Sequence, residues 1–174
     1  FGKTCGLVQV GELGCIETPI ALTNTLCVGR VADGLVTTAL REARSAGLPL
    51  PSTINPVVGE TNDGRVSDIR ARAVGESDVL AAIDSASADF ARGSVGAGRG
   101  TVCFGLKGGI GSSSRLIEIG GATYTLGVLV QSNFGRMPDL AVCGEPIGRR
   151  IAGKLAVTEE PERGSVMVVV ATDA

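Results

Sequence analysis

Histidine is absent from this chain of 174 residues, and so is tryptophan. Without histidine the chain cannot build a Ser-His-Asp triad, a Cys-His pair or a histidine-ligated zinc centre from its own residues. A nucleophilic side chain in this sequence therefore needs a base of another kind.

Two further shortages exclude classes of partner. Aromatic residues make up 3% of the chain and the net charge is −2 with dispersed Lys and Arg, so neither a stacking platform nor a basic patch for nucleic acid is present. No apolar run approaches the roughly 20 residues that a membrane-spanning helix needs. The opening "FGKTCGLVQV" lacks the layout of a signal peptide. We therefore expect no nucleic-acid or membrane partner and a cytoplasmic location.

The cysteines are odd in number and show no C-x-x-C spacing. This pattern favours small buried residues in a reducing compartment over a disulfide framework or a metal site. The five are Cys5, Cys15, Cys27, Cys103 and Cys143.

The composition, with 44% hydrophobic and 20% charged residues, predicts a single globular domain over residues 1–174. Two segments carry apolar residues at helical spacing, 30–47 and 76–90. Gly47 should end the first helix, and Ser77 is the expected N-cap of the second. A third, short helix is expected at 146–155.

Strand patterns are distributed along the chain. The expected elements are a strand at 16–25, a turn at Asn62-Asp63-Gly64, a hairpin at 115–135 around Gly120-Gly121, a short strand and turn at 140–148, and a buried strand at Val166–Val170. Strands and helices do not alternate regularly, which favours an α+β fold with a mostly antiparallel or mixed sheet.

The segment "RGSVGAGRGTVCFGLKGGIGSSSR", residues 92–115, is dense in glycine. Gly100 and Gly105 have the Walker spacing, but Lys107 comes one residue late, and the G-x-G-x-x-G pattern fails as well. A tight connection that lines some other site is the favoured interpretation, and a nucleotide-binding loop is the alternative.

Ser165 follows Gly164 and precedes the apolar strand, which leaves two interpretations open. It is an ordinary serine at the start of a strand, or it attacks the Gly164 carbonyl in an N-to-O acyl shift whose hydrolysis cuts the chain. The second route would give Ser165 a free α-amine, with a pKa of about 7.7 to 8.0 in model compounds, and this amine can act as the missing base.

Asn133 lies at the polar end of the apolar strand in "VLVQSNFG". It is either a turn residue or a hydrogen-bond donor for a developing oxyanion.

Five segments, taken in order, resemble the L-aminopeptidase/D-esterase family, the DmpA-like β-aminopeptidases. They are "ELGCIETPIALTNTLCVG", "PVVGETNDG", "GSVGAGRGTVCFGLKGGIGSSSR", "YTLGVLVQSNFG" and "GSVMVVVATDA". The resemblance implies a four-layer αββα sandwich shared with ornithine acetyltransferase and incomplete at both ends here. It also implies self-cleavage between Gly164 and Ser165, with 1–164 in the α chain and 165–174 opening the β chain.

The same resemblance implies a hydrolase that releases N-terminal residues from short peptides, amides or esters. Ser165 is then the nucleophile and Asn133 helps to stabilise the oxyanion, with no metal or organic cofactor. Family members usually assemble as tetramers of αβ units, and we expect the same of the full-length parent.

The sequence also departs from the family. Family chains extend beyond both ends of this one, and the downstream part carries a further serine and an acidic residue used in catalysis. The family uses a tyrosine near the active centre, which we expect at the "ET-x-DG" segment. There this chain has Asn62, and its only tyrosine, Tyr124, lies elsewhere. We therefore expect the isolated chain to be inactive and poorly stable and the full-length parent to be active. The alternatives are a non-catalytic binding or assembly homologue and an acyltransferase, although the acyltransferase branch typically has threonine where Ser165 stands.

Overall fold

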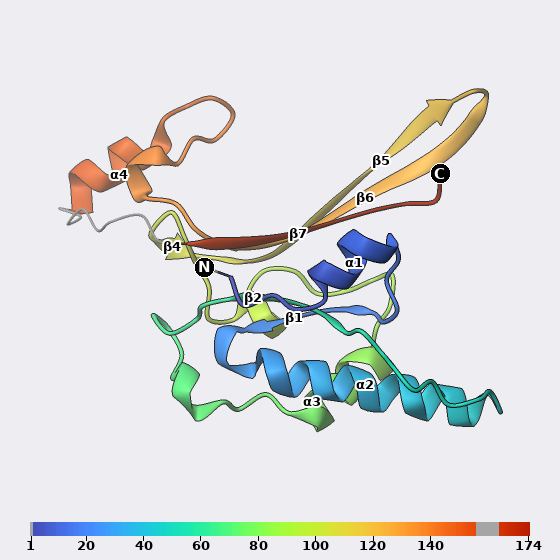
Figure 1. The fold of residues 1–174 in the computed structure, drawn as a ribbon. Coiled ribbons are helices and arrows are strands. Elements are labelled where there is room, and N and C mark those ends of the chain that lie inside the picture. The colour runs from blue at the N-terminus through green and yellow to red at the C-terminus, as the bar shows by residue number, and fades with distance from the viewer. Residues whose placement is uncertain (1, 156–163) are drawn as a thin grey trace. The chain divides into compact units, whose positions relative to one another are not determined.

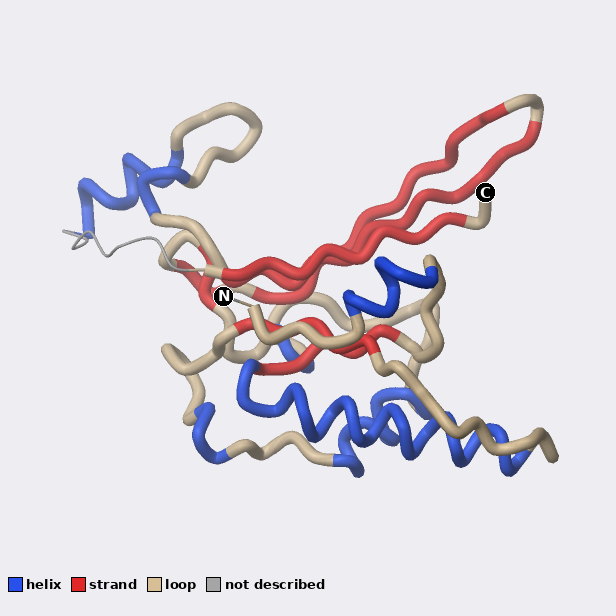
Figure 2. Tube along the Cα trace, in the orientation of Figure 1, coloured by secondary structure: helices blue, strands red, loops and turns tan. Residues whose placement is uncertain are grey.

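A computed structural model describes residues 2–155 and 164–174 of the chain. The backbone divides into two compact units, and Figure 1 labels many of the helices and strands that make them up. The first comprises Phe1–Glu60 with Asp68–Phe90, and the second comprises Thr61–Ser67 with Ala91–Ala174. Helices and strands occur in both units, as Figure 2 shows, so each has its own α+β character.

The first unit combines three α-helices with a two-stranded sheet. Its elements are α1 (Leu7–Leu13), β1 (Ile20–Asn24), α2 (Val28–Ser45), β2 (Val57–Thr61) and α3 (Glu76–Asp84), with β1 paired to β2. Two short 3-10 helices, η1 (Thr25–Cys27) and η2 (Ile69–Ala71), complete it. The strand predicted at 16–25 is confirmed as β1.

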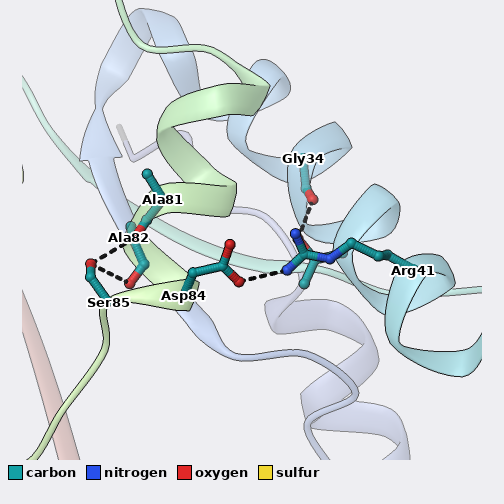
Figure 3. A network of polar contacts seen from close by, with 7 residues as sticks. Gly34, Arg41, Ala81, Ala82, Asp84 and Ser85 are labelled. Carbon is teal, nitrogen blue, oxygen red and sulfur yellow. Dashed lines mark hydrogen bonds and ion pairs between the residues drawn. The ribbon is translucent and has the colours of Figure 1, made fainter. Parts of the chain in front are cut away.

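The core of the first unit lies where α2 meets α3 and β2. Its buried members are Cys27, Val31, Leu35, Val58 and Val79. A Cβ at Gly34 would stand 2.9 Å from the Val79 side chain, so glycine allows the two helices to approach closely. Figure 3 shows Arg41 of α2 directed at Asp84 of α3, and their ion pair measures 2.8 Å.

The helix ends differ in part from the prediction. Gly47 adopts a φ of 66° just beyond α2, which confirms it as the stop signal. The expected N-cap at Ser77 is wrong, because α3 is capped by Gly75, whose N–H donates to the Asp78 carboxylate at 2.9 Å. The Ser85 hydroxyl donates to the Ala81 carbonyl at 2.6 Å, and α3 ends there rather than at residue 90.

The helix α1 was not predicted from the sequence. It has only seven residues and lies between Gly6 and Gly14, both with positive φ. These two glycines bound the helix at its two ends, and the seven residues between them are too few to show a helical period in the sequence.

The second unit is built on a three-stranded antiparallel sheet in the order β5-β6-β7. Its elements are η3 (Gly96–Gly98), β3 (Val102–Cys103), β4 (Leu106–Lys107), β5 (Gly109–Ile119), β6 (Ala122–Asn133), η4 (Met137–Asp139), α4 (Ile147–Leu155) and β7 (Ser165–Thr172). The predicted hairpin is confirmed, with Ile119 opposite Ala122 across Gly120-Gly121. The expected strand at 140–148 is reduced to a single bridge between Val142 and Glu145.

Strand β7 confirms the predicted strand near the end of the chain but not its burial. Val166, Val168 and Val170 are 41%, 54% and 61% exposed, while Met167 and Val169 on the other face are half-buried. The alternation follows from the pleat of the strand, which places Val166, Val168 and Val170 together on the more open face of β7.

The five cysteines are free thiols, and only Cys27 is fully buried. Cys15 and Cys143 are exposed, so the prediction that the cysteines act as small buried residues is wrong for these two.

Candidate active site

The pairing of β6 with β7 brings Ser165 and Asn133 together. The two residues are directly opposite each other in the antiparallel register, so their side chains emerge on the same face of the sheet. The Nδ2 atom of Asn133 lies 3.4 Å from the Ser165 Oγ. The proximity expected from the sequence is therefore observed, while the chemical roles of the two residues stay predictions.

The Asn133 side chain is held in one orientation by three partners. Its Oδ1 accepts a hydrogen bond from the Val102 N–H at 3.0 Å, and its Nδ2 donates to the Asn62 carbonyl at 3.0 Å as well as to Ser165. The residue is only 9% exposed. Since Val102 offers a donor and Asn62 an acceptor, the amide nitrogen is the atom that faces Ser165.

Gly164 packs against the end of β6. A Cβ at this position would stand 2.6 Å from the Cα of Phe134 and 2.8 Å from the carbonyl oxygen of Asn133, distances that only glycine avoids. The Gly164–Ser165 peptide bond thus lies beside the residue that carries the candidate oxyanion donor. Residues 156–163, which lead into it, are outside the described part of the chain.

The end of β6 is braced by the β3–β4 hairpin. The Phe104 N–H donates to the Phe134 carbonyl at 2.8 Å, and the two aromatic rings meet edge to face with centroids 5.3 Å apart. Phe104 and Gly105 form the hairpin turn with φ values of 52° and 72°. Residues 92–115 therefore form a 3-10 turn, a hairpin and the start of β5. This is not the loop and helix of a phosphate site, so the nucleotide-loop alternative is wrong.

The 61–67 segment forms the other support of the site. Gln131, fully buried on the same face of β6 as Asn133, donates a hydrogen bond to the Thr61 hydroxyl. The Asn62 side chain accepts from the Gly64 N–H at 2.9 Å, which confirms the predicted turn, and its backbone carbonyl is the group that reaches Asn133. Tyr124 lies at the opposite end of β6.

In this segment, the carboxyl group of Asp63 has a pKa that is shifted from its ordinary value. Burial raises the pKa of its carboxyl above the usual 3.8, and hydrogen bonds from its own backbone and from Ser67 oppose that rise in part. Its Oδ1 is buried without a hydrogen-bond partner among the described residues. Gly100 makes room for it, because a Cβ there would stand 2.4 Å from the Asp63 Cβ.

The groups that sequence reasoning missed are mostly backbone atoms. The Val102 N–H and the Asn62 carbonyl orient Asn133, and neither depends on the identity of the side chain, so no residue type marks them. Within residues 2–155 and 164–174 no group of three or more His, Cys, Asp and Glu side chains is arranged to hold a metal ion. The prediction that no cofactor is needed stays a prediction.

The helices of the described ranges are too short or too polar to cross a bilayer.

Comparison with known proteins places these features in a family context. The model of peptidase family S58 matches residues 1–174. Beta-peptidyl aminopeptidase BapA of Sphingosinicella microcystinivorans is 42% identical over 187 residues, which cover 99% of this chain and 46% of BapA.

Two solved structures resemble the fold closely. The PH0078 protein of Pyrococcus horikoshii OT3 aligns with a TM-score of 0.87 at 46% identity, over 99% of this chain and 47% of that one. The second is the L-aminopeptidase D-Ala-esterase/amidase of Ochrobactrum anthropi, described as a prototype of the serine aminopeptidases and a variant of the Ntn-hydrolase fold. It aligns with a TM-score of 0.86 at 34% sequence identity, over 99% of this chain and 47% of that one. These structures confirm the predicted α+β fold of the DmpA type. The chain spans about half the length of these relatives.

Proposed function

The chain belongs to peptidase family S58, and on this basis we propose that the complete polypeptide containing it is an autoprocessing serine aminopeptidase. Its substrates would be short peptides, amides or esters with a free N-terminal residue. The observation that carries the proposal is the placement of the Asn133 amide 3.4 Å from the Ser165 hydroxyl, with Gly164 packed beside both.

In the processing step the Ser165 Oγ attacks the carbonyl carbon of Gly164. The C–N bond breaks as the acyl group passes from the nitrogen to the oxygen and the nitrogen gains the proton, so an ester replaces the peptide bond. Water then hydrolyses the ester and leaves a carboxylate on Gly164 and a free α-amine on Ser165. This chemistry uses no histidine, in keeping with the composition of the chain.

In the peptidase step the new α-amine accepts the Oγ proton as Ser165 attacks the substrate carbonyl. Asn133 Nδ2 donates to the oxyanion that forms. The leaving amine departs with a proton, and water hydrolyses the acyl-enzyme to return Ser165. Donors beyond Asn133, if the complete protein has them, would add to the same stabilisation.

The relatives suggest which substrates to test. One is named a beta-peptidyl aminopeptidase and another an L-aminopeptidase and D-Ala-esterase/amidase. We propose that this protein acts on one of these aminoacyl classes, and that processed αβ units assemble into a tetramer.

The test compares the complete polypeptide with its Ser165→Ala variant, and uses Ser114→Ala on the exposed part of β5 as the matched control. Intact-mass measurement should show cleavage between residues 164 and 165 in the wild type and in the control only. Hydrolysis of L-, D- and β-aminoacyl p-nitroanilides should follow the same pattern. An uncut wild type, with Ser165→Ala equal to it towards all three substrates, would rule out the hydrolase and favour a non-catalytic homologue.

A further inference from the structure

The ammonium group of Lys107 is bound by three backbone carbonyls of the second unit. Its Nζ donates to the backbone carbonyls of Gly98 at 2.7 Å, Gly108 at 2.8 Å and Thr101 at 3.1 Å. An ammonium group has three protons to donate, so each is used on a carbonyl of the protein. Lys107 as a whole is nevertheless an exposed residue, and the charged head of an exposed lysine ordinarily stays in water.

The three carbonyls tie two separate segments together. Gly98 and Thr101 precede the β3–β4 hairpin, and Gly108 follows it. The Gly108 N–H also donates to the Thr101 carbonyl at 2.9 Å, so this one oxygen is held by a charged and a neutral donor. Hydrogen bonds from an ionised donor are about twice as strong as neutral ones, so Lys107 adds a charged restraint on the direction of the Thr101 carbonyl to the neutral one from Gly108.

The Thr101 carbonyl and the Val102 N–H belong to the same peptide group. That group is planar and trans, since the described backbone contains no cis peptide bond, so the two bonds point in opposite directions. A carbonyl fixed towards Lys107 therefore fixes the N–H towards the other side, where it meets the Asn133 Oδ1 at 3.0 Å.

We propose that Lys107 is a positioning residue for the Asn133 amide. Through the Thr101–Val102 peptide it keeps Oδ1 turned away from Ser165 and Nδ2 turned towards it. This inference rests on the proposed function, in which Nδ2 is the oxyanion donor. If the peptide rotated, the Asn133 amide could turn over and present an acceptor where the reaction needs a donor.

The main variant is Lys107→Met, which keeps the stem and removes the ammonium. Lys154→Met is the matched control, because it removes one charge from α4. In the complete polypeptide, Lys107→Met should lower kcat about tenfold or more, since displacement of a catalytic group by 1 Å costs up to about 10²-fold. KM should change by less than about threefold, because the interaction at stake is made in the transition state. The control should match the wild type.

A rescue experiment separates positioning from a merely structural role. Lys107→Ala leaves space for propylammonium, whose ammonium can reach the same three carbonyls. Propylammonium should restore kcat severalfold in Lys107→Ala, and tetramethylammonium, which has no N–H, should not. If kcat stays low with propylammonium, or if both variants fail to fold even with the amine, Lys107 is structural only and the inference is overturned.

A readout that needs no activity keeps the inference distinct from the proposed function. In ¹⁵N-labelled wild type, the Asn133 side-chain amide should give one pair of proton signals, and Lys107→Met should broaden or split that pair while Lys154→Met leaves it unchanged. If the wild type proves inactive, the proposed function fails and this measurement still decides the positioning role. An unchanged Asn133 signal in Lys107→Met overturns the inference, and so does an unchanged kcat in an active protein.

Discussion

Gly164 touches the backbone of Phe134, and the space between them cannot hold a methyl group. A Cβ on residue 164 would stand 2.6 Å from the Phe134 Cα and 2.7 Å from its Cβ. The residue that precedes the candidate nucleophile is thus fixed by a close approach of two backbones. The contact places the Gly164 carbonyl carbon, the target of the proposed self-cleavage, at the end of β6.

Replacement of Gly164 by alanine should therefore disturb both stability and processing. We expect Gly164→Ala to lower the free energy of unfolding by about 1 to 3 kcal/mol, as overpacking does, and to slow cleavage between residues 164 and 165. Urea unfolding and a time course of intact mass measure the two effects. Gly111→Ala on β5, where an added Cβ meets no atom within 4 Å, is the control and should leave processing unchanged. Equal cleavage rates in the two variants would contradict the role of the contact.

Asn133 should be needed for its N–H rather than for its shape. Asn133→Asp is nearly isosteric, but an ionised carboxylate only accepts hydrogen bonds and cannot donate to an oxyanion. We expect kcat to fall about 10²- to 10³-fold, the usual cost of one lost oxyanion donor. Steady-state hydrolysis of the preferred p-nitroanilide measures it. Ser132→Ala, on the opposite face of β6, should retain kcat within about twofold, and an active Asn133→Asp would remove Asn133 from the mechanism.

In the first unit, the close contact between α2 and α3 should make any side chain larger than that of glycine destabilising at position 34. Gly34→Ala places a Cβ 2.9 Å from Val79 and should destabilise the protein by about 1 to 3 kcal/mol. Val79→Ala in the same chain should recover part of that loss, because it removes the two opposing methyl groups, although the Cβ of residue 79 stays 2.9 Å from the new one. Gly29→Ala, on the same helix but facing open space, should instead stabilise by up to about 1 kcal/mol. Thermal unfolding of the wild type, Gly34→Ala, Val79→Ala, their double variant and Gly29→Ala tests the set, and additive effects of Gly34→Ala and Val79→Ala would contradict the contact.

Asp63 should make stability depend on pH in the acid range. Burial raises the pKa of its carboxyl in the folded state above 3.8, the value of the unfolded chain. Between these two values the folded state holds a proton that the unfolded state has lost, so stability falls as the pH rises through that window. Asp63→Asn should remove this contribution and raise the urea midpoint at pH 7 more than at pH 3. Asp89→Asn, at an exposed carboxylate, is the control, and equal pH profiles for wild type and Asp63→Asn would contradict the assignment.

Much of the site could be predicted because its two side chains sit on strongly patterned strands. The Gly120-Gly121 turn fixes the register of β5 on β6, and the apolar runs identify β6 and β7. No tight turn joins β6 to β7, however, so the pairing of Asn133 with Ser165 depends on contacts between distant parts of the chain. The proximity was expected from the roles that the resemblance implies for the two residues, not from a local rule.

The remaining features lack a sequence signal for separate physical reasons. Strand β5 begins at Gly109 inside a glycine-rich stretch, because its pairing with β6 overrides the poor strand propensity of glycine. Ser77 matches the N-cap composition, yet Asp78 caps the Gly75 N–H and shifts the start of α3. In the sequence, Lys107 is recognisable only as a lysine one residue late for the Walker pattern. Its three partners are backbone carbonyls, which no residue type marks.

The three partners of the Asn133 amide come from three separate stretches of the chain, represented by Asn62, Val102 and Ser165. None of the three bonds can form until strands far apart in the sequence have found their final neighbours. A partly folded chain therefore lacks the alignment of the Asn133 amide with the Ser165 hydroxyl, and this arrangement exists only in the finished structure. In this geometry a chain cleaved before Ser165 would be one in which the second unit had already folded.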